Sequence, residues 1–197
     1  MNNLNQQLEF ILELDKLKAI YRQTTVMPDN NRYENSAEHS WHIAMMANIL
    51  HEYAEKPVNI SRVINMLLIH DIVEIDAGDT FAFAEQVDLD SQVNKELEAA
   101  NRLFGLLPEQ QFQLFKNLWI EFENAETDDA KFAKAMDRLL PLLQNMQNNG
   151  GSWAKHKVNK NQVLERNQYL EKMAPKLWQY ACEQIDVAVS NGWLVDA

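Results

Sequence analysis

The segment that decides the fold is SRVINMLLIHDIVEIDAGD, residues 61–79. Val63, Leu67 and His70 follow one another at steps of four and three residues, which is the spacing of one face of an α-helix and not the alternation of a strand. Charged side chains come directly after the apolar run MLLI, and Gly78 is the expected end of the helix. The segment therefore predicts a helix that carries ionisable groups into the core.

Helical spacing of apolar residues recurs through almost the whole chain, which only five glycines and five prolines interrupt. The predicted fold class is therefore all-α, in a single domain over residues 1–197. Besides the helix that starts near residue 61, apolar faces mark helices at 10–21, 39–53, 93–104, 112–122 and 132–146, and closing helices between 161 and 190.

Capping residues and breakers indicate where these helices begin and end. The first helix, which includes Arg22 near its end, should stop before Met27 and Pro28. Ser36 is expected to cap the second helix and Pro108 to open the fifth. The sixth helix should open at one of the two aspartates 128 and 129.

Two stretches lack helical spacing and are expected to be loops. They are residues 28–35 and the glycine-containing NMQNNGGSWAKHK, residues 145–157. Pro141 can kink the helix before the second loop, because proline lacks the N–H of a helical hydrogen bond. The helices at 93–104 and 112–122 are expected to form an antiparallel hairpin.

The composition indicates a cytoplasmic protein without a membrane segment. Apolar residues make up 46% of the 197 residues, which is enough for a substantial core. No stretch approaches eighteen apolar residues, and the N-terminal MNNLNQQLEF lacks the basic and apolar regions of a secretory signal. Cys182 is the only cysteine, so a metal site would have to consist of histidine and carboxylate ligands.

The charge balance argues against nucleic acid as a partner. The chain has 29 acidic and 18 basic residues, a formal charge of −11 that repels long polyanions. A small phosphorylated ligand remains compatible with this charge, because it needs only one or two locally placed cations.

Buried carboxylates in the deciding segment require compensation, and a divalent metal ion would supply it. Adjacent His70 and Asp71 point about 100° apart on a helix, so other helices must complete the shell. His39 and Asp137 are the best candidates. Imidazole and carboxylate ligands suit one Mn, Fe, Co, Ni or Zn ion better than Mg. The other histidines have no expected metal role.

The order H…HD…D on separate helices resembles the signature of the HD superfamily, an all-helical bundle. SAEHSWHIAMMANIL and LLIHDIVEIDAGDT are most similar to small bacterial 5′-deoxynucleotidases and their HD-domain phosphohydrolase relatives. The resemblance covers most of the chain, with the signature residues between 22 and 137. It implies the four metal ligands His39, His70, Asp71 and Asp137.

The same resemblance implies the residues that contact substrate. Glu74 and Asp79 match catalytic carboxylates, and Arg22 matches an arginine that contacts phosphate. Arg32 could help Arg22 to hold the phosphate, although nothing in the sequence fixes the direction of the Arg32 side chain. Gln23 stands where the deoxynucleotidases have a tryptophan, and TFAFAE replaces their basic, proline-containing stretch, so the base and sugar preferences stay open.

The expected function is hydrolysis of a nucleoside 5′-monophosphate by a metal-dependent phosphomonoesterase. In this scheme the metal lowers the pKa of a bound water, Glu74 orients that water or accepts its proton, Asp79 protonates the leaving oxygen and Arg22 holds the phosphate. A phosphodiesterase or nucleotide pyrophosphohydrolase is the alternative enzyme, and a non-catalytic nucleotide sensor is the alternative binding protein. The resemblance also implies a homodimer.

Simpler interpretations exist for several of these residues. Asp137 could pair with Arg138 or Lys134 at the helix surface. The aromatic residues of the helix at 112–122 fit a core or a subunit contact better than a base-stacking platform. Trp153 could form a wall of the substrate site or anchor its loop to the body of the protein.

Overall fold

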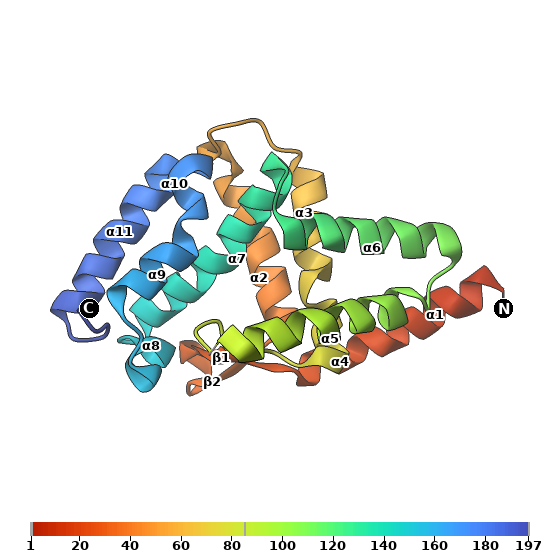
Figure 1. Cartoon of the computed structure of the whole chain (residues 1–197), viewed down its shortest axis with the longest axis horizontal. Helices are drawn as coiled ribbons and strands as arrows, with labels where there is room; N and C mark the ends of the chain where they lie inside the picture. The colour runs from red at the N-terminus through yellow and green to blue at the C-terminus, as the bar shows by residue number, and fades with distance from the viewer. Residues whose placement is uncertain (1, 85, 197) are drawn as a thin grey trace.

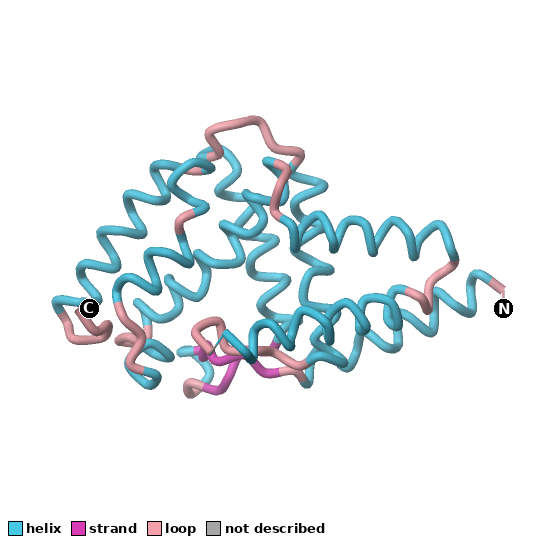
Figure 2. Tube along the Cα trace, in the orientation of Figure 1, coloured by secondary structure: helices cyan, strands magenta, loops and turns pink. Residues whose placement is uncertain are grey.

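Helices make up most of the computed structural model, which describes residues 2–84 and 86–196 (Figure 1). Among these described residues, strand is limited to two short segments, drawn in magenta in Figure 2. In chain order, with 3₁₀-helices labelled η, the elements are α1 (Asn3–Glu13), η1 (Leu14–Ala19), β1 (Tyr21–Val26), η2 (Met27–Asp29), β2 (Arg32–Asn35), α2 (Ser36–Leu50), η3 (His51–Tyr53), α3 (Ile60–Ile69), η4 (His70–Val73), α4 (Glu74–Ala77), α5 (Gln86–Phe104), α6 (Glu109–Asn124), α7 (Asp128–Gln147), α8 (Gly151–His156), α9 (Lys160–Asn167), α10 (Tyr169–Met173) and α11 (Pro175–Ser190). The predicted all-α class is confirmed, with a small sheet added.

Helix α7 lies at the centre of the molecule. It contacts α2, α3 and α6 on one side and α8 to α11 on the other (Figure 1). Phe132, Met136 and Leu139 are buried on its apolar face, as the spacing predicted. Helices α5 and α6 form the expected antiparallel hairpin, and Trp119 and Phe122 of α6 belong to the core. Among the described residues, no helix combines the length and the apolar character that crossing a bilayer requires.

The prediction of one helix through residues 10–21 was wrong at its end. Helix α1 stops at Glu13, a 3₁₀-helix follows, and β1 pairs antiparallel with β2. The reversal uses Asn30 and Asn31, whose φ angles of 51° and 57° lie in the left-handed region that asparagine tolerates. The expected loop at 28–35 therefore contains half of a hairpin, and Arg22 lies on a strand.

The cap of α2 is Asn35, not Ser36 as predicted. The Asn35 side chain accepts from the N–H of Glu38 at 2.9 Å, and the Glu38 carboxylate accepts from the N–H of Asn35 at 3.2 Å. This reciprocal pair is a capping box. Ser36 is consequently the first residue of the helix, and its hydroxyl is available for a contact elsewhere.

The helix of the deciding segment changes pitch at the ionisable residues. Helix α3 ends at Ile69, and a 3₁₀-helix carries His70 and Asp71 before α4 begins at Glu74. The Trp119 indole N–H donates to the carbonyl oxygen of His70 at 3.2 Å, so that oxygen is engaged outside the helical ladder. Gly78 ends α4 as expected, with φ of +76°.

Later boundaries differ from the predictions by a few residues. Pro108 is the N-cap of α6, and Thr127 caps α7, which opens at Asp128. Helix α7 continues through Pro141 to Gln147. The expected loop at 145–157 contains α8, and the closing segment forms three helices rather than two.

Candidate functional site

The four predicted metal ligands are buried together between α2, η4 and α7. His39 Nε2 lies 2.9 Å from Asp137 Oδ1, and His70 Nε2 lies 3.5 Å from the same oxygen. His70 Nε2 also lies 2.9 Å from Asp71 Oδ1. Ligand atoms of His39, His70 and Asp137 fall within 4.8 Å of one another, which is close enough for one cation to reach all three.

The ring nitrogens of His70 are oriented as a metal ligand requires. Nδ1 lies 2.8 Å from the carbonyl oxygen of Leu67, and this contact assigns the proton to Nδ1. Nε2 is buried close to the carboxylates of Asp71 and Asp137, but it makes no well-aligned hydrogen bond with any of the described residues. A buried lone pair beside two carboxylates fits a divalent cation, and the histidine and carboxylate donors fit a transition-metal ion.

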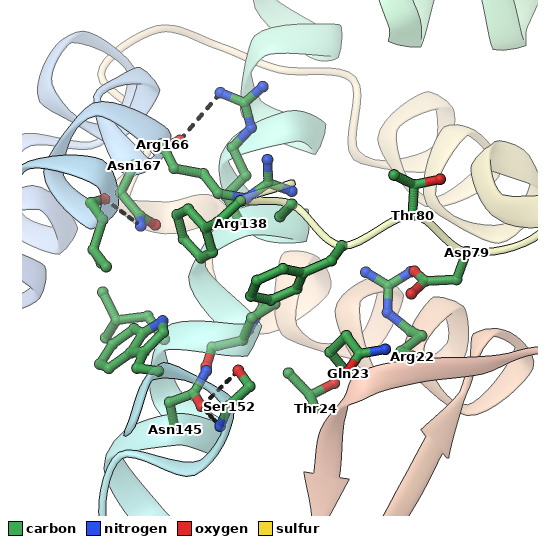
Figure 3. Close-up of a pocket in the computed structure, with 17 residues that line it drawn as sticks. Arg22, Gln23, Thr24, Asp79, Thr80, Arg138, Asn145, Ser152, Arg166 and Asn167 are labelled. Atoms are coloured by element: carbon green, nitrogen blue, oxygen red, sulfur yellow. Dashed lines mark hydrogen bonds and ion pairs between the residues drawn. The ribbon is translucent and has the colours of Figure 1, made fainter. Parts of the chain in front are cut away.

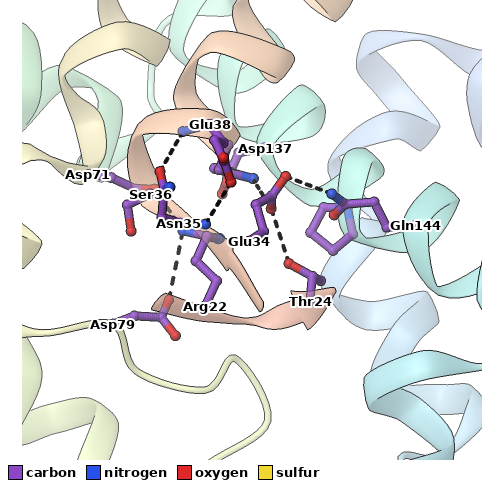
Figure 4. A network of polar contacts seen from close by, with 12 residues as sticks. Arg22, Thr24, Glu34, Asn35, Ser36, Glu38, Asp71, Asp79, Asp137 and Gln144 are labelled. Atoms are coloured by element: carbon purple, nitrogen blue, oxygen red, sulfur yellow. Dashed lines mark hydrogen bonds and ion pairs between the residues drawn. The ribbon is translucent and has the colours of Figure 1, made fainter. Parts of the chain in front are cut away.

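Glu34, which the sequence did not single out, holds the other imidazole. Its Oε2 lies 3.4 Å from His39 Nδ1, so Nε2 of His39 is turned towards Asp137. Glu34 is itself fixed by Thr24 Oγ1 at 3.1 Å and by Gln144 Nε2 at 2.7 Å (Figure 4). A carboxylate behind a ligating histidine sets its tautomer and raises its basicity.

The electrostatics of the cluster favour positive charge. Burial lowers the pKa of His70, but Asp71 and Asp137 outweigh it and raise the pKa to about 10. Burial raises the pKa of Asp71, but His70 and Arg22 outweigh it and hold the pKa at about 2. Both aspartates are therefore ionised at neutral pH, and a divalent ion would take the place of the proton on His70.

Arg22 joins the metal cluster to the predicted catalytic carboxylates. Its Nη1 lies 2.7 Å from Asp71 Oδ2 and 3.8 Å from Asp79 Oδ1 (Figure 4). The same nitrogen lies 3.6 Å from Glu74 Oε1. The Ser36 hydroxyl donates to Glu74 Oε2 at 2.5 Å. Burial, followed by the charge of Asp71, raises the pKa of Glu74 well above its usual range, and burial also raises the pKa of Asp79. A raised pKa makes a carboxyl group a better proton acceptor and donor in a reaction, so both groups are candidates for proton transfer.

Arg32 does not join this cluster. Its guanidinium is exposed and pairs with Glu38 at 2.7 Å and with Asp29 at 2.5 Å. The hollow that it lines lies beside Trp41, outside the pocket next to Arg22. The structure therefore gives Arg32 a role in the hairpin and in the start of α2.

A pocket opens directly beside the cluster (Figure 3). Arg22 and Asp79 line one end, Phe81 and Phe83 come from the segment after Gly78, and residues of α7, α8 and α9 complete the wall. Trp153 lines this pocket and is also only 2% exposed, so it is both wall and anchor. The segment TFAFAE, at which the sequence differs from the resembling deoxynucleotidases, thus contributes residues 80–83 to the pocket, while Glu85 lies outside the described residues.

The surface interpretation of Asp137 does not hold. Lys134 pairs with Glu123 at 3.0 Å, and Arg138 donates to the carbonyl oxygen of Arg166 at 3.1 Å. Asp137 instead faces the two histidines.

Relatives of this chain include named deoxynucleotidases. The human 5′-deoxynucleotidase HDDC2 is 29% identical over 70% of this chain and 65% of its own length, and the bovine HDDC2 is 30% identical with the same coverage. The chain thus spans slightly less than two thirds of these relatives. The 5′-deoxynucleotidase YfbR of Salmonella paratyphi B is 27% identical over 84% of this chain and 88% of its own.

A solved structure agrees with nearly the whole fold. A predicted metal-dependent phosphohydrolase from Magnetospirillum magnetotacticum MS-1 is 49% identical, with a TM-score of 0.92 over 98% of this chain and 96% of that chain. An HD-domain phosphohydrolase from Listeria innocua shares the fold, with a TM-score of 0.65 at 15% identity. The family model described as HD domain matches residues 14–178, a span that contains the whole cluster. This protein belongs to the HD-domain family.

Proposed function

We propose that this protein is a metal-dependent phosphohydrolase that releases phosphate from nucleoside 5′-monophosphates or similar small phosphomonoesters. The observation that carries the proposal is the Nε2 of His70, buried among Asp71, Asp137 and His39 next to Arg22 without a well-aligned hydrogen bond to any of the described residues. The names of the human, bovine and Salmonella relatives support a nucleotide substrate, and the Magnetospirillum neighbour supports metal dependence.

His39, His70, Asp71 and Asp137 would hold one divalent ion, for which Mn, Fe, Co, Ni and Zn are better candidates than Mg. Bound there, the ion supplies Lewis acidity that makes water a stronger nucleophile at neutral pH. Glu34 keeps His39 in the tautomer that leaves its Nε2 lone pair available.

The remaining steps belong to residues of the chain. Arg22 reaches the substrate phosphate as a planar, permanently charged donor and offsets the charge that develops on its oxygens. Glu74, held through Oε2 by Ser36, accepts the proton of the attacking water. Asp79 lines the pocket, and its raised pKa lets it donate a proton to the leaving 5′-oxygen.

We also propose that the enzyme acts in the cytoplasm on small substrates. Its net charge of −11 disfavours binding to nucleic acid or to an anionic membrane surface. For a homodimer, α2 presents Trp41, Met45 and Ile49 with 63%, 43% and 62% of their surface exposed. Light scattering on the purified protein tests the dimer, which a monomeric mass at micromolar concentration would contradict.

Phosphate release from a panel of ribo- and deoxyribonucleoside monophosphates, with Mn, Co, Zn or Mg, tests the activity. Glu74→Gln should abolish release while the metal stays bound. Glu126→Gln is the matched control because it removes the same charge at an exposed position. Hydrolysis of diesters without phosphate release would favour the phosphodiesterase. Nucleotide that is bound and recovered intact would favour the sensor.

A further inference from the structure

Two arginines that line the pocket beside the cluster form no ion pair with a carboxylate among the described residues. Of the six arginines in the chain, Arg22, Arg32, Arg62 and Arg102 each pair with an acidic side chain. Arg138 of α7 and Arg166 of α9 do not pair with any carboxylate in the part of the chain that the structure describes. This is unexpected in a protein with 29 acidic residues.

Arg138 and Arg166 both line this pocket, and Figure 3 shows the Arg138 guanidinium directed to the backbone of Arg166. Arg138 donates to the backbone oxygen of Arg166 at 3.1 Å and lies 4.4 Å from the centre of the Tyr169 ring. Arg166 is half-buried, and burial lowers its pKa; the charge of Asp137 opposes this effect, and repulsion from Arg138 adds to it. Two neighbouring guanidinium groups of like charge are better accommodated when an anion lies between them.

The pocket between this pair and Arg22 has firm apolar walls. The rings of Phe81 and Phe83 pack edge to face with centres 5.5 Å apart, and the buried Trp153 lines the same pocket. Asn145 holds the wall, since its Oδ1 accepts from the N–H of Ser152 at 2.7 Å and from its hydroxyl at 3.0 Å. Such walls accept the planar or weakly polar middle of a ligand whose two ends are charged.

We infer that Arg138 and Arg166 form a second anion subsite, and that the preferred substrates are nucleotides with a second phosphate besides the one that is hydrolysed. This inference rests on the proposed function for the position of the first phosphate, near Arg22. Hydrolysis adds water across the P–O bond at the Arg22 end only, and the second phosphate leaves unchanged on the product. Paired arginines bind a phosphate dianion through several parallel N–H donors, and a neutral sugar or base offers no equivalent acceptor.

Calorimetric titration of the full-length, Mn-loaded protein tests the subsite. Adenosine 3′,5′-bisphosphate and 2′,5′-bisphosphate are compared with adenosine 5′-monophosphate, in a Glu74→Gln background that prevents turnover. At least one bisphosphate should bind ten-fold or more tightly than the monophosphate. Arg166→Met and Arg138→Met should each reduce this ratio to within about two-fold of one.

Two control variants separate the subsite from general charge and from folding. Lys95→Met removes one positive charge at an exposed site outside the pocket and should leave the ratio unchanged. Arg166→Lys keeps the positive charge and serves as the second variant if Arg166→Met does not fold. It should retain part of the preference for the bisphosphate. Equal binding of all three nucleotides to the parent protein, or a preference that survives both methionine variants, overturns the inference. A preserved preference without phosphate release from any nucleotide by the otherwise wild-type protein would overturn the proposed function and keep the subsite.

Discussion

Replacement of Glu34 by glutamine should weaken metal binding, although Glu34 is not itself a proposed ligand. Glu34 is 2% exposed, and its Oε2 lies 3.4 Å from His39 Nδ1, which makes no hydrogen bond among the described residues. The nearby negative charge favours the proton on Nδ1 and so leaves Nε2 for the metal. Glutamine keeps the volume but removes the charge. Its amide can also turn an N–H towards His39, which favours the wrong tautomer.

The expected loss is ten- to a hundred-fold in metal affinity, or about 1.4 to 2.7 kcal/mol, which is the usual effect of removing such a supporting carboxylate. Fold stability should change less, because Gln144 Nε2, which donates to Oε1, can still donate to the glutamine carbonyl, and the Thr24 hydroxyl, which contacts Oε2, can turn to accept from the amide N–H. The two effects can therefore be measured separately.

Competition with a fluorescent chelator gives the metal affinity, and thermal unfolding of the metal-free protein gives the stability. Glu126→Gln, at an exposed position, controls for the change in net charge. A Glu34→Gln protein that binds metal within two-fold of the parent would refute the orienting role. A large loss of stability in the metal-free protein would show that Glu34 acts mainly as a structural residue.

Three further predictions concern the pocket wall next to Gly151, the proposed base Glu74 and the binding of a metal ion. Gly151→Ala should destabilise the fold by about 1–3 kcal/mol in thermal melts, because φ of Gly151 is +38° and an added Cβ would lie 2.6 Å from Asn145 Oδ1. Gly192→Ala is the control: its Cβ meets open space, so this variant should lose less stability. Burial raises the pKa of Glu74, and the hydrogen bond from the Ser36 hydroxyl opposes that rise. Ser36→Ala should therefore raise the pKa of Glu74 further and move the acid limb of the pH profile of kcat/KM upwards by about one pH unit. An acid limb that does not move would argue against Glu74 as the base. Mn²⁺ at about a hundred times its Kd should stabilise the fold by about 2.7 kcal/mol, and a similar gain in Asp137→Asn would contradict the proposed ligand set.

The helical core and the members of the cluster could be predicted because both can be recognised from the spacing of residues within short stretches of the sequence. Apolar spacing identified the faces of α2, α3 and α7 that are buried. On these faces an ionisable residue stands out, as His39 and Asp137 do, because burying it requires a partner. The structure brings these residues together with His70 and Asp71 from segments far apart in the chain.

The β1–β2 hairpin, Glu34 and Arg166 cannot be recognised from such short stretches. β1 and β2 are short and polar, and each contacts helices from other parts of the chain: β1 packs against α7 and α8, and β2 packs against α2. Glu34 lies in that polar stretch, where the sequence does not distinguish it from glutamates that are exposed. Arg166 occupies an ordinary position near the end of a helix, and its significance depends on the pocket that it lines together with α7. Contacts between distant segments decide all three cases.

The position of Arg22 on a strand, and not on a helix, changes how metal and substrate sites can act on each other. Asp71 directs Oδ1 to His70 and Oδ2 to Arg22, so one carboxylate is shared by the metal cluster and the proposed phosphate contact. When a cation occupies the cluster, it draws charge from Asp71 and weakens its hold on Arg22. The guanidinium is then better able to bind a phosphate, which the acidic surroundings would otherwise repel. By thermodynamic linkage, a phosphate bound at Arg22 must strengthen metal binding by the same factor.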